Sequence, residues 1–112
     1  MQIQRETLGG AVVLKPSGRI DQNTSEEFQS ALLASLAEAP NGLVLDMRGV
    51  GFISSMGLRA LMTAVRKAKS DNVKIALSGL TPTVKEVFSI SRFTTVIPCL
   101  EDLDAAVAKL KG

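Results

Sequence analysis

Two adjacent serines, Ser54 and Ser55, are the residues of this chain whose type and setting best suit chemistry. They follow an apolar stretch at 43–45 and a glycine-spaced segment at 49–51, and they open a helical pattern. Backbone N–H groups at a helix start lack intrahelical partners, and the macrodipole places about half a positive charge there. A hydroxyl in this first turn is therefore well placed to carry a phosphate, although a serine there can also simply cap the helix.

The groups that most enzymes need are missing from this sequence. It has no histidine and one cysteine, Cys99, so His-dependent triads and thiolate metal clusters are excluded. The Gly49-Val50-Gly51 segment lacks the third glycine of a dinucleotide fingerprint and the lysine of a P-loop. Asp21 and Asp46 stand alone at the ends of apolar stretches, where aspartates usually form turns or caps. The chain is predicted not to be an enzyme and to use no cofactor or metal.

Composition narrows the class of partner. The net charge is +2, tryptophan and tyrosine are absent, and the four phenylalanines sit in apolar patterns, so direct nucleic-acid binding is not expected. No apolar run approaches the ~20 residues that cross a bilayer, and no basic segment followed by an apolar one opens the chain. With Cys99 unpaired, we expect a cytoplasmic protein without membrane insertion. A length of 112 residues fits a single domain over 1–112.

The elements around the serines follow from hydrophobic periodicity. The order β-β-α-β-α-β-α-β-α predicts an α/β fold, with an N-terminal hairpin, a mainly parallel mixed sheet of about five strands and about four helices. Strands are expected at 1–6, 11–17, 43–47, 73–77 and 95–97. Helices are expected from 24 to about 39, over 55–70, from 82 onward and over 100–111.

Capping patterns mark two of these helix starts. Thr24 and Glu27 have the spacing of a capping box, in which the threonine hydroxyl accepts a hydrogen bond from the backbone three residues on. Thr81 precedes Pro82, which places a capping hydroxyl before a proline at the first helical position. Pro16 predicts a sheet edge or a strand end.

The helix after the serines carries a candidate contact surface. Met56 and Ala60 are four residues apart, on a flank between the core stripe and the charged stripe. We expect them to form a small exposed apolar patch beside the serines, because flexible methionine on a surface suits protein contacts.

The segments 17–21, 43–46 and 52–59 together resemble the STAS domain of bacterial anti-sigma factor antagonists. The resemblance extends over nearly the whole chain, including 80–88 and the last helix. It implies a STAS-like fold and a partner switch that regulates transcription. The unphosphorylated protein would bind an anti-sigma factor, itself a serine kinase, and so release the sigma factor. Phosphorylation at the start of the second helix would end that binding, and a serine phosphatase is a further expected partner.

The resemblance also assigns roles to residues. Ser55 matches the phosphoacceptor, and Asp21 matches an acidic residue near it, although capping the first helix is an alternative role for Asp21. Gly57 is expected to leave room for close approach of the partner. The predicted partner-binding residues are Asp21, Thr24, Ser54, Met56, Gly57, Arg59, Ala60 and Thr63.

Two departures from the family pattern keep alternatives open. Ser54 stands where many members have aspartate, and Met56 stands where they have a small hydroxylated residue. Ser54 is therefore the second candidate for phosphorylation. An alternative function is an interaction module of a transporter or lipid-transport complex that works without phosphorylation. A small nucleotide-binding protein or enzyme, built on the strand-to-helix loop, ranks third. The sequence predicts no oligomeric state.

Overall fold

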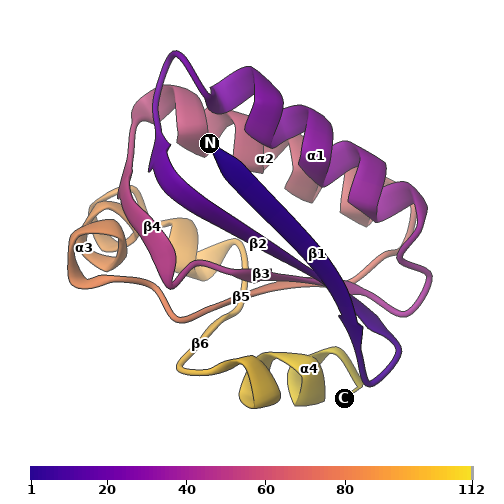
Figure 1. Ribbon diagram of the computed structural model, residues 1–112. Helices are drawn as coiled ribbons and strands as arrows, with labels where there is room; N and C mark the ends of the chain where they lie inside the picture. Colours follow the sequence, from indigo (N-terminus) through magenta and orange to yellow (C-terminus); the bar gives the residue numbers. More distant parts are fainter. Residues whose placement is uncertain (112) are drawn as a thin grey trace.

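The chain forms a six-stranded mixed sheet with helices on both faces (Figure 1). The computed structural model describes residues 1–111. In chain order the elements are β1 Gln2–Leu8, β2 Ala11–Ile20, α1 Ser25–Ala37, β3 Leu43–Asp46, β4 Gly49–Ile53, α2 Ser55–Ser70, β5 Ile75–Ser78, α3 Pro82–Ile90, a 3₁₀ turn Phe93–Thr95, β6 Cys99–Leu100 and α4 Leu103–Lys111. The predicted α/β class, hairpin and mainly parallel sheet are confirmed.

The sheet is built around β2, which has two successive partners on one side. The strand order is β1-β2-β3-β5-β6, with β1 antiparallel to β2 and the other pairs parallel. Residues 12–14 of β2 pair with β3, and residues 17–20 pair with β4 across a bulge after Gly18. Pro16 lies between these two stretches, inside β2, and not at the sheet edge or strand end that we expected, so a residue without an N–H sits where the partner of β2 changes.

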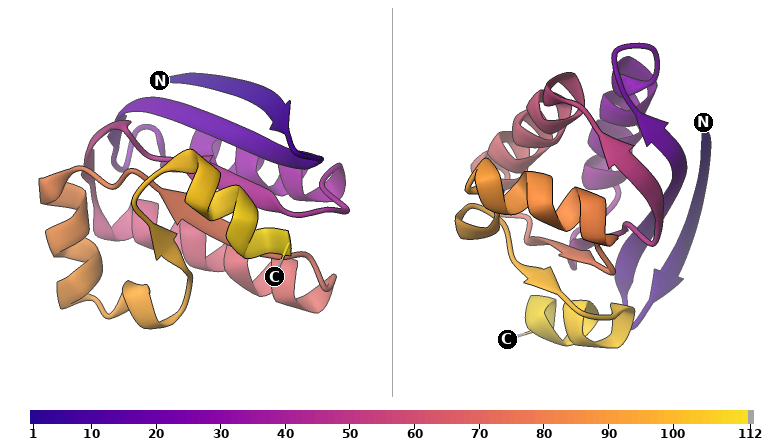
Figure 2. Two further views of the ribbon diagram at one scale, coloured as in Figure 1. Left: turned by 90° about the horizontal axis from the view of Figure 1, so that it is seen from below. Right: turned by 90° about the vertical axis from the view of Figure 1, so that its left-hand side faces the viewer.

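Alternation along the central strands divides the core into two layers. On one face, Leu14, Leu45 and Leu77 join the large cluster that includes Leu32 and Leu61 of α1 and α2. The side chains that alternate with these along the strands point to the other face of the sheet. There Ala11, Val13, Val44 and Ala76 form a second cluster with Ala106, Val107 and Leu110 of α4. Figure 2 shows this arrangement, with α1 and α2 on one side of the sheet and α4 on the other. Strands buried on both faces read as continuous apolar runs, which is why they were recognisable in the sequence.

Two strand predictions were wrong. Residues 49–53, expected as a loop, form β4, because their backbone pairs with the second half of β2. The last strand is Cys99–Leu100, and not 95–97. Phe93 is buried against Phe88, with ring centroids 5.5 Å apart, and this contact folds the segment into a 3₁₀ turn. The last helix begins at Leu103, since the Asp102 carboxylate accepts a hydrogen bond from the Ala105 N–H at 2.8 Å.

Neither threonine caps its helix as expected. The Thr24 hydroxyl accepts from the Asp21 N–H at 2.9 Å and donates to the Arg19 carbonyl at 2.7 Å, so the predicted capping box does not form. Thr81 is the residue before α3, and Pro82 is at the first turn as predicted. The Thr81 hydroxyl, however, donates to the Val50 carbonyl at 2.9 Å. The Thr24 hydroxyl thus orders the turn before α1, and the Thr81 hydroxyl fastens α3 to β4.

Candidate functional site

The start of α2 is fixed by Ser54. Its backbone is extended, with φ −90° and ψ 174°, and its hydroxyl accepts a hydrogen bond from the Gly57 N–H at 3.3 Å. Its own N–H donates to the Ile20 carbonyl at 2.8 Å. Ser54 is therefore the N-cap residue, and it also ties the helix start to the end of β2.

Ser55, in contrast, is the first residue of α2 and is exposed. Within residues 1–111 its side chain makes no hydrogen bond, whereas Ser54 is half-buried and engaged as the cap. The two neighbouring hydroxyls are thus not equivalent. Only Ser55 combines access from solvent with a free oxygen at the positive end of a helix, and the geometry favours it over Ser54 as an anion carrier.

The turn before α1 lies beside this helix start. Ser54 is bonded to Ile20, the residue that precedes Asp21, so Asp21 is brought next to the serines as predicted. Figure 1 shows the β2–α1 connection and the start of α2 at the same end of the molecule. The Asp21 carboxylate accepts from the Asn23 N–H at 2.9 Å and lies 3.7 Å from the Arg19 guanidinium. It orders its own turn while remaining partly exposed.

The predicted Met56–Ala60 patch is wrong. Met56 is 46% exposed, but Ala60 is only 2% exposed because it faces the core together with Leu61 and Ala64. Gly57 is buried too. A Cβ added there would lie 2.7 Å from both the Cγ2 methyl of Ile20 and the Cγ1 methylene of Ile53, so the missing side chain makes room for the sheet and not for a visiting partner.

The exposed face of α2 borders a hollow that sequence reasoning did not find. Arg59 is exposed, and Thr63, also predicted, is half-buried with its hydroxyl donating to the Arg59 carbonyl at 3.1 Å. The hollow measures about 460 Å³ and is lined by Ser55, Leu58, Arg59, Met62, Arg66 and Phe93. Helical spacing of three and four residues from Ser55 could have identified the α2 side. Phe93 lies in a segment distant in sequence, which no local pattern links to α2.

Asp46 is a structural carboxylate, consistent with its expected place at a strand end. It is 3% exposed and accepts hydrogen bonds from the Arg48 N–H and guanidinium, the shortest at 2.7 Å. Burial alone would raise the pKa of Asp46. The hydrogen bonds from Arg48, the charge of Arg48 and that of Lys15 outweigh burial and hold this pKa below its ordinary value. The pair shapes the turn between β3 and β4.

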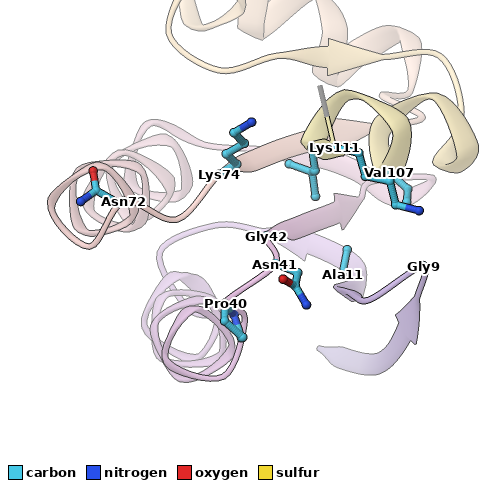
Figure 3. Close-up of a pocket in the computed structure, with 10 residues that line it drawn as sticks. Gly9, Ala11, Pro40, Asn41, Gly42, Asn72, Lys74, Val107 and Lys111 are labelled. Carbon is cyan, nitrogen blue, oxygen red and sulfur yellow. The ribbon is translucent and has the colours of Figure 1, made fainter.

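A second hollow, of about 410 Å³, lies at the opposite end of the sheet (Figure 3). It is formed by the connections that enter β3 and β5, by Gly9 and by the last turns of α4. Ser55 follows the carboxyl end of β4, so this second hollow is remote from the serines. None of the predicted site residues lines it.

Within residues 1–111, no group of three or more histidine, cysteine, aspartate or glutamate side chains is arranged to hold a metal ion. In the same part of the chain, no helix has the length and apolar character needed to cross a membrane.

Fold and site together define a small α/β module that presents one accessible serine at a helix start, beside a turn carrying an aspartate. The family model for the STAS domain matches residues 2–106. The chain belongs to the STAS domain family, and the predicted resemblance is confirmed.

Named relatives agree with this assignment. The chain is 27% identical over 111 residues to BtrV of Bordetella bronchiseptica, named as an anti-sigma factor antagonist, covering 99% of this chain and 96% of BtrV. Its fold matches that of an anti-sigma factor antagonist from Mycobacterium paratuberculosis with a TM-score of 0.89, at 24% identity over 99% of this chain and 94% of that one. It also matches Bacillus SpoIIAA in its phosphorylated form, with a TM-score of 0.71 and 17% identity over 97% and 99% of the two chains.

Proposed function

We propose that this protein is an anti-sigma factor antagonist that works as a phosphorylation-controlled partner switch. The unphosphorylated form binds an anti-sigma factor, and this binding releases the sigma factor. The observation that carries the proposal is the exposed hydroxyl of Ser55 at the first residue of α2, which forms no hydrogen bond within residues 1–111. The antagonist names of the relatives support it.

The off state is produced by the anti-sigma factor, which also acts as a serine kinase. It transfers the terminal phosphoryl group of a bound nucleoside triphosphate to the Ser55 oxygen. A bond forms between that oxygen and phosphorus, the bond to the nucleoside diphosphate breaks, and the hydroxyl proton is released. The phosphate adds about −1.5 to −2 charges at neutral pH. A helix N-terminus tolerates this charge, but a partner surface that closes over it does not.

The partner surface follows from which predicted residues are accessible. The predicted residues that are exposed or half-buried are assigned to docking, and they are Asp21, Thr24, Ser54, Met56, Arg59 and Thr63. Gly57 and Ala60 act inside the protein and are left out of that surface. A serine phosphatase that hydrolyses the phosphoester would reset the switch.

The test compares Ser55→Asp and Ser55→Ala for binding to the kinase that co-purifies with the protein from its native cell. Ser55→Ala should bind as the wild type does, and Ser55→Asp should bind at least tenfold more weakly in calorimetry. Mass spectrometry of the 54–55 peptide after incubation with kinase and ATP should locate the phosphate on Ser55. Equal affinities for both variants, or phosphate found on Ser54 alone, would contradict the proposal.

The alternative function makes an opposite prediction. An interaction module of a transporter or lipid-transport complex would bind its partner equally well whatever the state of Ser55. The same calorimetric comparison therefore separates the two functions.

A further inference from the structure

The hollow beside α2 has a basic rim and an apolar floor. Of its six lining residues, Arg59 and Arg66 are the charged ones, and Leu58, Met62 and Phe93 supply the apolar surface. Both arginines are exposed. Within residues 1–111, neither guanidinium forms an ion pair or a hydrogen bond, whereas the neighbouring Lys67 is paired with Asp71. Two unpaired cations on one rim are available to an anion.

Of the two arginines, Arg59 is the one that lies close to Ser55. The two residues are four apart on α2 and line the same hollow, so they are neighbours on the helix surface. Side chains on a helix lean toward its N-terminus, which brings the Arg59 side chain back over Ser55. An acidic group one turn before a basic one is also the more favourable orientation of such a pair.

We infer that, once Ser55 is phosphorylated, the phosphate is held by the guanidinium of Arg59. This inference rests on the proposed function and specifies how its off state is built. Guanidinium donors match phosphate oxygens in pairs, so Arg59 suits this contact better than a lysine would. The free N–H groups of the first helical turn add to the attraction.

The pairing changes the hollow as well as the charge at Ser55. Arg59 is drawn to the start of the helix, and the Ser55 end of the rim loses its free cation. A partner whose acidic side chain uses Arg59 therefore loses that contact at the same time as it meets the phosphate. The modification thus acts on the docking surface twice without unfolding any element.

Arg66 provides a matched control. It is the same residue type on the same helix and the same hollow, but it is eleven positions from Ser55. At 1.5 Å per residue this is about 16 Å along the axis, beyond the reach of one side chain. Both arginines are exposed, so replacing either one should leave the fold intact, which circular dichroism would verify.

The experiment is a phosphorus NMR titration of the full chain with phosphoserine incorporated at position 55 during synthesis. A nearby cation favours the dianionic phosphate, so the proton-binding constant of the phosphate should be about threefold lower in the wild type than in Arg59→Gln. Arg66→Gln should titrate as the wild type does. Added salt should reduce the difference between wild type and Arg59→Gln, because the pair is exposed.

Two results would overturn the inference: identical titrations for wild type and Arg59→Gln, or an equal change in Arg59→Gln and Arg66→Gln. The second result would mean that overall charge, and not a specific pair, sets the phosphate equilibrium. The titration needs neither kinase nor sigma factor. Failure of the ion pair is therefore distinguishable from failure of the proposed function, which is measured by partner binding.

Discussion

Replacing Gly57 by alanine tests whether this glycine serves packing or partner approach. The added Cβ would lie 2.7 Å from the Ile20 Cγ2 and Ile53 Cγ1 atoms and 3.1 Å from the Ile20 carbonyl oxygen. Overpacking of this kind costs about 1–3 kcal/mol, while alanine in a helix gains roughly 0.5–1 kcal/mol over glycine. A backbone oxygen cannot rotate away, so we expect a net loss of about 1–2 kcal/mol in the free energy of unfolding.

Gly51→Ala is the matched control, because an added Cβ at Gly51 meets no atom of the described residues 1–111 within 4 Å. The free energy of unfolding of this variant should be between that of the wild type and about 1 kcal/mol above it, since alanine restricts the unfolded chain. The chain has no tryptophan or tyrosine, so urea unfolding is best followed by far-ultraviolet circular dichroism. A stability of Gly57→Ala equal to that of Gly51→Ala would refute the packing role and restore Gly57 to the partner surface.

Three further predictions concern side chains near the strand ends and the helix start. Ser54→Ala removes the cap of α2 and should cost about 1 kcal/mol in urea unfolding, and phosphorylation of Ser55 by the kinase should persist. Ser78→Ala should raise the free energy of unfolding by about 1 kcal/mol, because its hydroxyl is buried without a partner within residues 1–111; a loss of stability would show that the hydroxyl is satisfied. Asp46→Asn should unfold at lower urea than the wild type at neutral pH. The folded-state pKa of Asp46 is depressed, so its contribution is full above the unfolded pKa and is lost as pH falls through the folded value. The gap between the two proteins should therefore narrow below about pH 4, and a gap independent of pH would contradict the ion-pair explanation.

The sequence was most informative where one element is both amphipathic and capped. The bounds of α2 were predicted as 55–70 and are Ser55–Ser70, because apolar spacing and the serines act together. β4 was missed because its two glycines indicate a loop, and its strand character comes from pairing with β2, which is distant in sequence. The burial of Ala60 was missed for a related reason. The periodicity placed it on a flank, but α2 packs against α1 as well as against the sheet, and this widens the buried face.

The candidate site, too, was predictable from the sequence only in part. Ser54 and Ser55 are indistinguishable by residue type, and only their hydrogen bonds separate the capping hydroxyl from the free one. Asp21 was placed near them by resemblance alone, and the bond from Ser54 to Ile20 supplies the physical cause. Long-range contacts of this kind have no signature in a short sequence window.

The packing around Ser55 gives a physical reason why, in the proposed switch, a single phosphate would be enough to control binding. On the inner side, Gly57 fits against the sheet with no spare volume, and Ser54 is bonded both to Gly57 and to β2. The helix start is therefore held in place, and a group added to Ser55 can project only outward. A rigid support cannot absorb the new charge by moving, so under the proposal the charge is met either by Arg59 or by a partner that approaches from solvent. The same rigidity keeps Arg59 one turn away in either state, which makes the choice between partner and phosphate a direct electrostatic competition.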